Sequence, residues 1–176
     1  KVILNDIKVI MDEKSRMDIA CPLQVDYVEV EPTLLNQDKP FDAAFYLHGQ
    51  NGVRINNSHI TGGMKAIGGR LTGNFRPELN FVDIDHCQWA IQIIGGGVLA
   101  KNCSFTDNGA GLDIQANTLP NIIENCNFTD NYPYGILVDG TNLGELYLTY
   151  STIDGAHECI ISAGTPVRAF CNKLNH

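Results

Sequence analysis

VLAKNCSFTDN at residues 98–108 and NIIENCNFTDN at residues 121–131 decide the fold of this chain, because they are two copies of one pattern. Both copies contain the core N-C-x-F-T-D-N, and the phenylalanines of the two cores, Phe105 and Phe128, are 23 residues apart. Repetition at a fixed period of this length is typical of solenoid proteins, in which each repeat forms one turn. The sequence on either side contains further, weaker copies.

Two columns of apolar residues continue the repeat on both sides, with steps of 21 to 25 residues. The first column contains Ile60, Ile84, Phe105, Phe128, Ile153 and Leu174, and the second contains Ile67, Ile91, Leu112, Ile136 and Ile160. Within a copy the apolar residues alternate with other residues, as in Leu112 and Ile114, and this period of two predicts short strands. No copy contains a ten-residue segment with helical periodicity, and the columns lack the regular leucines of a leucine-rich repeat.

Short strands and a period near 23 residues predict an all-β fold, a parallel β-helix of about five to six coils with about three strands per coil. Neighbouring coils should lie about 4.8 Å apart, with Phe105 on Phe128 and Leu112 on Ile136 in a continuous core. An outer ladder of asparagines is expected at the turn before one strand. Its members are Asn57, Asn102 and Asn125, and Phe81 and Tyr150 interrupt it.

The domain organisation follows from where the repeat is recognisable. Residues 41–176 carry it, whereas residues 1–40 fit it poorly and are expected to form an irregular N-terminal coil or cap, with a strand at 26–31 and a loop at 32–40. The chain starts without a methionine or signal peptide and ends directly after a repeat-like strand. We therefore expect a segment of a larger parent chain, or a homo-oligomer in which another copy supplies the missing cap.

Composition narrows the classes of partner. The chain has 176 residues, 44% of them hydrophobic and 18% charged, with a formal net charge of −8. It contains no run rich in lysine or arginine, so nucleic acids and anionic membrane surfaces are poor candidate partners. It also contains no stretch of eighteen apolar residues, so no membrane span is expected.

The pattern G-[IL]-x-[VI], followed by N-C-x-F-x-x-N, resembles the right-handed parallel β-helix proteins of the pectate-lyase-like superfamily over roughly residues 41–176. The resemblance implies a right-handed solenoid. It does not imply one activity, because the superfamily includes polysaccharide lyases, glycoside hydrolases, epimerases, phage tailspikes, adhesins and inert surface repeats.

In that superfamily, active sites lie on the outer face of one sheet, and four polar residues are predicted to share such a face here. Alternation around GLDI directs Gln92 and Asp113 outward, and two residues further along each strand come Gln115 and Asp139. Asp113 and Asp139 would be roughly 8 Å apart, one coil apart and offset by two residues. That separation suits an inverting pair of catalytic carboxylates or one Ca²⁺ ion, with Gln92 and Gln115 binding substrate. The more common explanation for such residues is that both aspartates are solvated carboxylates of an exposed sheet, with Asp139 starting a turn.

Other motifs leave the question of an enzyme open. The N-T-D, D-D, G-H-G and R-I-K elements expected in a polygalacturonase are absent from the sequence, and no cluster of cations accompanies the aspartates. Six cysteines form no zinc-binding motif, so no metal site is predicted from them. Cys103 and Cys126 should be inward neighbours, as thiols or as a disulfide. Leu137 and Ile161 should face outward, which indicates a surface covered by a loop, another domain or another subunit.

The expected function is therefore that of an extracellular or cell-surface β-helix module that binds a saccharide or a surface protein, or that acts as a rigid spacer. One alternative is a polysaccharide lyase or glycoside hydrolase that acts on an acidic polysaccharide through Asp113 and Asp139. Another is a segment of a phage tailspike or adhesin. No cofactor is expected, apart from the Ca²⁺ ion considered above.

Overall fold

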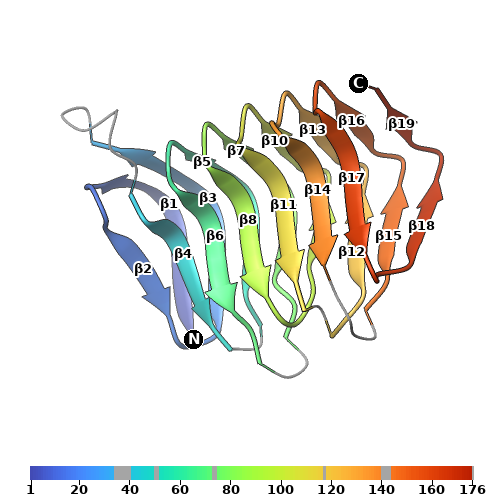
Figure 1. Cartoon of the computed structure of the whole chain (residues 1–176). Coiled ribbons are helices and arrows are strands. Elements are labelled where there is room, and N and C mark those ends of the chain that lie inside the picture. Colours follow the sequence, from blue (N-terminus) through green and yellow to red (C-terminus); the bar gives the residue numbers. More distant parts are fainter. Residues whose placement is uncertain (34–40, 50–51, 73–74, 117, 140–143, 176) are drawn as a thin grey trace.

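The computed structural model describes residues 1–33, 41–49, 52–72, 75–116, 118–139 and 144–175, and all of its regular elements are β-strands wound into a solenoid (Figure 1). One sheet contains β1 (Val2–Met11), β3 (Leu23–Pro32), β5 (Arg54–Thr61), β7 (Glu78–Asp85), β9 (Leu99–Lys101), β10 (Ser104–Thr106), β12 (Asn121–Glu124), β13 (Asn127–Thr129), β15 (Leu146–Thr149), β16 (Thr152–Asp154), β18 (Val167–Phe170) and β19 (Lys173–Leu174). The other contains β2 (Arg16–Ile19), β4 (Ala43–His48), β6 (Lys65–Arg70), β8 (Trp89–Ile94), β11 (Ala110–Gln115), β14 (Tyr134–Asp139) and β17 (Glu158–Ala163).

Parallel pairing between successive turns confirms the predicted β-helix. The seven-stranded sheet has one strand per turn, so the chain makes about seven turns instead of the five to six predicted. The difference arises at the N-terminus, where β1 to β4 join the two sheets although their sequences lack the N-C-x-F pattern. The predicted strand at 26–31 lies within β3, and residues 34–40 of the predicted loop lie outside the described residues. The described chain contains no helix long and apolar enough to span a membrane.

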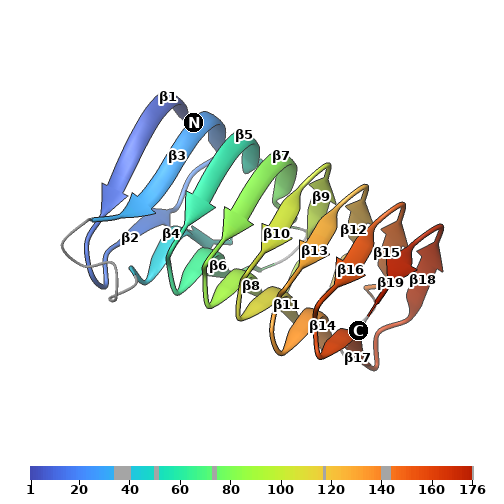
Figure 2. The same cartoon turned by 90° about the horizontal axis from the view of Figure 1, so that it is seen from above.

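The twelve-stranded sheet bends at a corner that recurs in every turn (Figure 2). In β7, residues 78–80 pair with β9 and residues 83–85 pair with β10, and Phe81 between them has a φ of 54°. Positive φ angles stack along the solenoid at equivalent positions, which we call the corner column: Asp6, Tyr27, Asn57, Phe81, Asn102, Asn125, Tyr150 and Cys171. The left-handed conformation at each of these residues turns the strand onto a new face of the solenoid.

Two outer surfaces of the solenoid carry the candidate sites. The β10 face is the outer surface of β10, β13, β16 and β19 together with the C-terminal halves of β3, β5 and β7, and the β8 face is the outer surface of the seven-stranded sheet. The β10 face begins at the corner column. Side chains that point outward from neighbouring turns form rows across each surface, because the strands pair in register.

The core consists of the two predicted columns, now seen in register. Phe105 pairs with Phe128, and their rings stack with centroids 4.7 Å apart. Leu112 pairs with Ile136, and all four side chains are fully buried. A Cβ atom on Gly111 would lie 2.7 Å from Cδ1 of Phe128, so this glycine makes room for the ring. The apolar columns therefore hold the turns together from within.

The buried cysteines are free thiols. Cys87, Cys103 and Cys126 occupy successive turns, and none forms a disulfide. Cys103 and Cys126 directly follow residues of the corner column, whereas Cys87 lies between β7 and β8. Burial raises the pKa of Cys87 to about 12. A hydrogen bond with the Cys126 thiol, together with burial, raises the pKa of Cys103 as well. Both thiols are therefore protonated at neutral pH and behave as small apolar side chains.

Candidate functional site

The four residues predicted to form a site lie together on the β8 face. Asp113 of β11 pairs with Gln92 of β8 and with Leu137 of β14, and Gln115 pairs with Asp139 in the next row. The offset of two residues between the aspartates is the one that the repeat predicts. Register on this face therefore follows from the sequence, whereas the contacts of the side chains do not.

Asp113 is a buried carboxylate held by two amides. Asp113 is only 3% exposed, and its carboxylate accepts hydrogen bonds from Nε2 of Gln92 (2.9 Å) and from Nε2 of Gln115 (3.2 Å). Burial, followed by the charge of Asp113, raises the pKa of the neighbouring Tyr134. Asp139 is exposed at the end of β14, and no hydrogen bond joins it to Asp113 in the described chain.

The structure thus brings Gln92, Asp113 and Gln115 together and leaves Asp139 in solvent. A catalytic role for the two aspartates, and substrate binding by the two glutamines, stay predictions. The described residues contain no group of three or more histidine, cysteine or acidic side chains arranged to hold a metal ion. Leu137 and Ile161 are half-buried neighbours in the same outward row.

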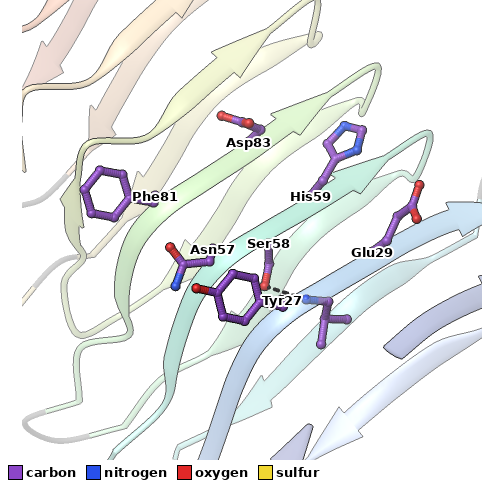
Figure 3. A pocket seen from close by; sticks show the side chains of 8 residues that line it. Tyr27, Glu29, Asn57, Ser58, His59, Phe81 and Asp83 are labelled. Carbon is purple, nitrogen blue, oxygen red and sulfur yellow. Dashed lines mark hydrogen bonds between the residues drawn. The ribbon is translucent and has the colours of Figure 1, made fainter. Parts of the chain in front are cut away.

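A groove of about 530 Å³ lies on the β10 face beside the corner column, which the sequence did not indicate (Figure 3). It crosses β3, β5 and β7. Its lining consists of Tyr27, Val28, Glu29, Asn57, Ser58, His59, Phe81 and Asp83. We call it the aromatic groove, because Tyr27 and Phe81 stand on either side of Asn57.

The two aromatic side chains are unusual in both exposure and backbone conformation. Tyr27 is 60% exposed and Phe81 is 56% exposed, and both have φ angles above 50°. Asparagine tolerates this left-handed conformation, and it occupies the turn between them at Asn57. For a bulky residue the conformation costs about 1–2 kcal/mol, and such strain is concentrated at ligand-binding sites. Because two strand spacings separate them, Tyr27 and Phe81 stand roughly 9.5 Å apart.

Polar side chains line the groove next to the aromatic pair. Glu29, His59 and Asp83 form one row across three strands, because Glu29 pairs with His59 and His59 pairs with Asp83 (Figure 3). Glu29 lies 3.5 Å from Nζ of Lys8. Asp83 has no hydrogen-bond or ion-pair partner in the described chain, so its carboxylate is open to a ligand.

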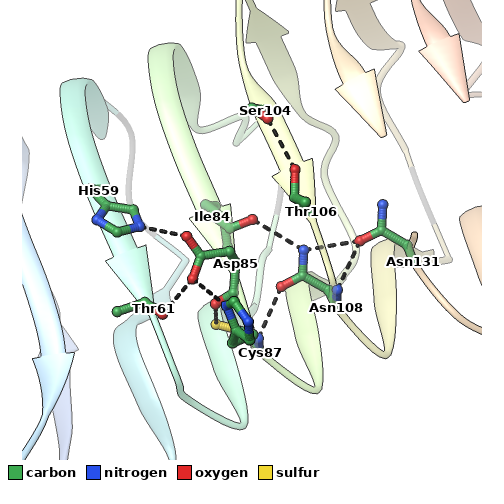
Figure 4. A network of polar contacts seen from close by, with 10 residues as sticks. His59, Thr61, Ile84, Asp85, Cys87, Ser104, Thr106, Asn108 and Asn131 are labelled. Atoms are coloured by element: carbon green, nitrogen blue, oxygen red, sulfur yellow. Dashed lines mark hydrogen bonds and ion pairs between the residues drawn. The ribbon is translucent and has the colours of Figure 1, made fainter. Parts of the chain in front are cut away.

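The row leads to a cluster in which two histidines share one carboxylate (Figure 4). Asp85 accepts hydrogen bonds from Nε2 of His59 (2.6 Å), from Nδ1 of His86 (2.8 Å) and from the hydroxyl of Thr61. Burial opposes the charged form of Asp85, but the hydrogen bonds from Thr61, His86 and His59 outweigh it and lower its pKa. The hydrogen bond to Asp85 raises the pKa of His86.

A buried asparagine ladder supports this part of the face from within (Figure 4). Nδ2 of Asn108 donates to Oδ1 of Asn131 (2.9 Å) and to the carbonyl of Ile84 (3.1 Å), while Oδ1 of Asn108 accepts from the amide of Cys87 (3.0 Å). Nδ2 of Asn131 donates to the carbonyl of Phe105. These bonds satisfy backbone groups where the chain passes from one sheet to the other, so the asparagines fix the bend beside which the exposed cluster lies.

Sequence reasoning missed the aromatic groove for a definable reason. Tyr27 lay in the segment that fitted the repeat poorly, and Phe81 counted only as an interruption of the asparagine series. The sequence signal for the groove is an aromatic residue where the repeat favours asparagine. Tyr27, Phe81 and Tyr150 all occupy such corner positions.

Comparison with known proteins agrees with the geometry at the level of the fold. A family model described as a right handed beta helix region matches residues 35–167, well over half of the chain. No curated protein and no solved structure gave a significant match. The match therefore establishes the architecture and leaves the ligand to be inferred from the site.

Proposed function

This chain belongs to the right-handed beta helix family, and from that premise we propose that it is a rigid module that binds a saccharide in the aromatic groove. The pair of exposed aromatic side chains on strained backbone carries the proposal. We further propose that it acts outside the cell or at the cell surface, where polysaccharides and surface glycoproteins occur.

The spacing of the aromatic walls supports a ring-shaped ligand. A saccharide ring has apolar C–H faces and a polar rim, and each face packs well against an aromatic ring. Carbon atoms in contact are about 3.5–4.0 Å apart, so walls roughly 9.5 Å apart leave room for one ring between Tyr27 and Phe81. The further sugar units of a longer saccharide would extend from between the two rings and lie along the row of Glu29, His59 and Asp83.

The polar groups of the groove suit hydroxyls. The free carboxylate of Asp83 accepts hydrogen bonds from hydroxyl groups, and charged acceptors form the stronger bonds. Nε2 of His59 is held by Asp85, which leaves Nδ1 for a ligand. Nδ2 of Asn57 donates to Asp26 (2.8 Å), which leaves its amide oxygen as an acceptor. A few polar groups around an apolar floor are typical of sites that orient small ligands.

The proposal is tested by titrating neutral and acidic oligosaccharides into the protein by isothermal calorimetry, first with the wild type and then with Tyr27→Asn and Phe81→Asn. Asparagine keeps the corner conformation, so both variants should fold and lose at least about tenfold in affinity, which is 1.4 kcal/mol. Tyr150→Asn is the matched control, because Tyr150 is a 66% exposed corner residue outside the groove.

Two results contradict the proposal. One is that no oligosaccharide of the panel binds to the wild type. The other is that Tyr150→Asn weakens binding as much as Phe81→Asn does, since binding would then depend on aromatic surface in general and not on the groove.

A further inference from the structure

A second hollow, of about 490 Å³, lies on the β8 face near the N-terminal turns and is separate from the aromatic groove. Tyr46, Gly68 and Gln92 form one outward row across β4, β6 and β8, since they pair in register. Gly68 lacks a side chain, so the row is interrupted between the tyrosine and the glutamine. The lining consists of Tyr46, His48, Lys65, Gly69, Arg70, Gln92 and Ile94, which we call the arginine hollow.

Arg70 distinguishes this hollow because its charge is uncompensated. The other four arginines have partners: Arg16 with Asp18 (3.1 Å), Arg54 with Glu78 (2.9 Å), Arg76 with the carbonyl of Pro120 (3.5 Å) and Arg168 with Glu145 (3.1 Å). Arg70 is exposed and has no ion-pair or hydrogen-bond partner in the described chain. In a chain with a net charge of −8, an unpaired guanidinium beside a hollow is a site for an anion.

The surrounding charges leave an excess of about one positive charge. His48 pairs in register with Arg70, and its Nε2 is bound to Asp18 (2.6 Å). Nζ of Lys65 lies 3.8 Å from Asp42 and 5.7 Å from the centroid of the Trp89 ring. Asp18 and Asp42 also contact Arg16 (3.1 and 3.5 Å), so these two carboxylates balance Arg16 and Lys65, and the positive charge of Arg70 remains. A singly charged anion would balance it.

Neutral groups around the hollow are suited to hydroxyls. Nε2 of Gln92 donates to Asp113, so its amide oxygen is left to accept a hydrogen bond. The hydroxyl of Tyr46 has no hydrogen-bond partner in the described chain, and one face of its ring is covered by Arg16, with Cζ 4.6 Å from the centroid. Arginine binds carboxylates through two parallel N–H bonds, which fixes the orientation of a planar anion.

We propose that the arginine hollow binds a carboxylate-bearing polyhydroxy ligand, whose carboxylate pairs with Arg70 and whose hydroxyls meet Gln92 and Tyr46. The site lies on another sheet from the aromatic groove, so it does not depend on the proposed function. It also gives Gln92 a role apart from the aspartate pair.

Gly68 provides an independent geometric argument. Its φ lies outside the left-handed region, and a Cβ atom there would approach only Cδ of Lys65 closely, at 2.8 Å. Since that atom belongs to a flexible side chain, the backbone does not require glycine at this position. By contrast, at Gly69 a Cβ atom would lie 2.4 Å from the carbonyl oxygen of Leu47. The stem of Lys65 thus covers Gly68, and a side chain at this position would displace it.

The test is a titration of the protein with gluconate, a polyhydroxy carboxylate, followed by ¹⁵N chemical shifts and calorimetry. Sorbitol is the neutral counterpart and sulfate is the simple anion. Gluconate should bind and perturb the amides of residues 68–70 and 92. A polymer bearing the same carboxylates should perturb the same amides if the natural source is a polysaccharide.

Two variants remove the site by different means, with thermal melts to confirm that each is folded. Arg70→Gln should weaken gluconate binding at least about tenfold, since it removes the charged donor that would pair with the carboxylate. Gly68→Gln should do the same, because the new side chain would displace the stem of Lys65, which lines the hollow. Arg54→Gln is the matched control, because it removes the same charge on the other sheet and should change the affinity less than twofold.

Any of three outcomes overturns the proposal: gluconate fails to bind the wild type, sorbitol or sulfate binds equally well, or Arg54→Gln weakens binding as much as Arg70→Gln. The last result would mean that gluconate responds to the overall charge of the protein and not to the hollow.

Discussion

The corner column uses one backbone conformation in two ways. At Asn102 and Asn125 the left-handed residue is an asparagine, and Nδ2 of Asn125 donates to Oδ1 of Asn102 (2.7 Å), so the corner is tied to the next turn. At Tyr27 and Phe81 the same conformation carries an exposed aromatic ring that forms no such bond. Stability and surface chemistry therefore compete at a single position of each turn. Four substitutions, ordered by expected effect, test how far the two regions differ.

The largest effect on the free energy of unfolding is expected in the core. The core should contribute equally beneath asparagine corners and beneath aromatic corners. Phe128→Ala removes one ring of the stacked pair and should lower the free energy of unfolding by about 3–5 kcal/mol. Denaturant unfolding followed by circular dichroism measures it. Phe81→Ala is the control, since it removes an equally large but exposed ring. Equal losses in the two variants would show that the corner aromatics are structural.

The buried asparagine ladder should come next. Asn131→Ala leaves the carbonyl of Phe105 and the amide of Asn108 without their partner. Leaving buried polar groups unpaired costs about 1–3 kcal/mol each, so the variant should unfold at a clearly lower denaturant concentration. Asn127→Ala, an exposed position of β13, should be nearly neutral. If the two variants have the same midpoint, the ladder does not hold the turns.

The third substitution should raise stability instead of lowering it. Phe81→Asn replaces a strained aromatic residue by the residue that tolerates the corner, so the free energy of unfolding should increase by about 1 kcal/mol. The same variant should lose saccharide affinity in the aromatic groove. Tyr150→Asn should gain similar stability without loss of affinity. A destabilised Phe81→Asn protein would mean that the ring packs productively on the corner.

The smallest effect is expected at Asp85 and depends on pH. The lowered pKa of Asp85 gives stability that is present above the usual aspartate pKa and is lost as pH falls through the lowered value. The raised pKa of His86 gives stability that is present below about pH 6.5 and is lost as pH rises through the raised value. Asp85→Asn should therefore destabilise the protein more at pH 5 than at pH 8, by roughly 0.2–1 kcal/mol.

Unfolding midpoints of the wild type and of Asp85→Asn at the two pH values measure the difference. Asp154→Asn is the charge control. Asp154 lies in the same row as Asp85, three turns further along the solenoid, because Asp85 pairs with Thr106, Thr106 with Thr129, and Thr129 with Asp154. A difference between wild type and Asp85→Asn that is the same at both pH values would argue against the pairing of Asp85 with the histidines.

The sequence predicted the register well and the first turns poorly, for a physical reason. Repeated apolar residues must stack to leave water, so the spacing of Phe105 and Phe128 determines how their turns align. Near the N-terminus the step between corner residues Tyr27 and Asn57 is 30 residues, well above the 21 to 25 found later. Because of that longer step, the repeat is not recognisable in the sequence of β1 to β4.

The candidate sites were predictable only in part. Alternation placed Gln92, Asp113, Gln115 and Asp139 on one face, because strand geometry sets the direction of each side chain. It did not show that both glutamines donate to Asp113, since that depends on rotamers and burial. No sequence pattern distinguishes Arg70, and its significance depends on the lack of an ion-pair partner, which only the arrangement of the neighbouring carboxylates reveals.

The buried thiols make local opening of the solenoid measurable. Cys87, Cys103 and Cys126 are buried in consecutive turns, and burial raises the pKa values of Cys87 and Cys103, whereas Cys171 is exposed. An alkylating reagent attacks the thiolate, so it reaches the three inner sulfurs only when a turn separates from its neighbours. Their individual labelling times would then report, turn by turn, whether the coil frays from one end or comes apart all at once.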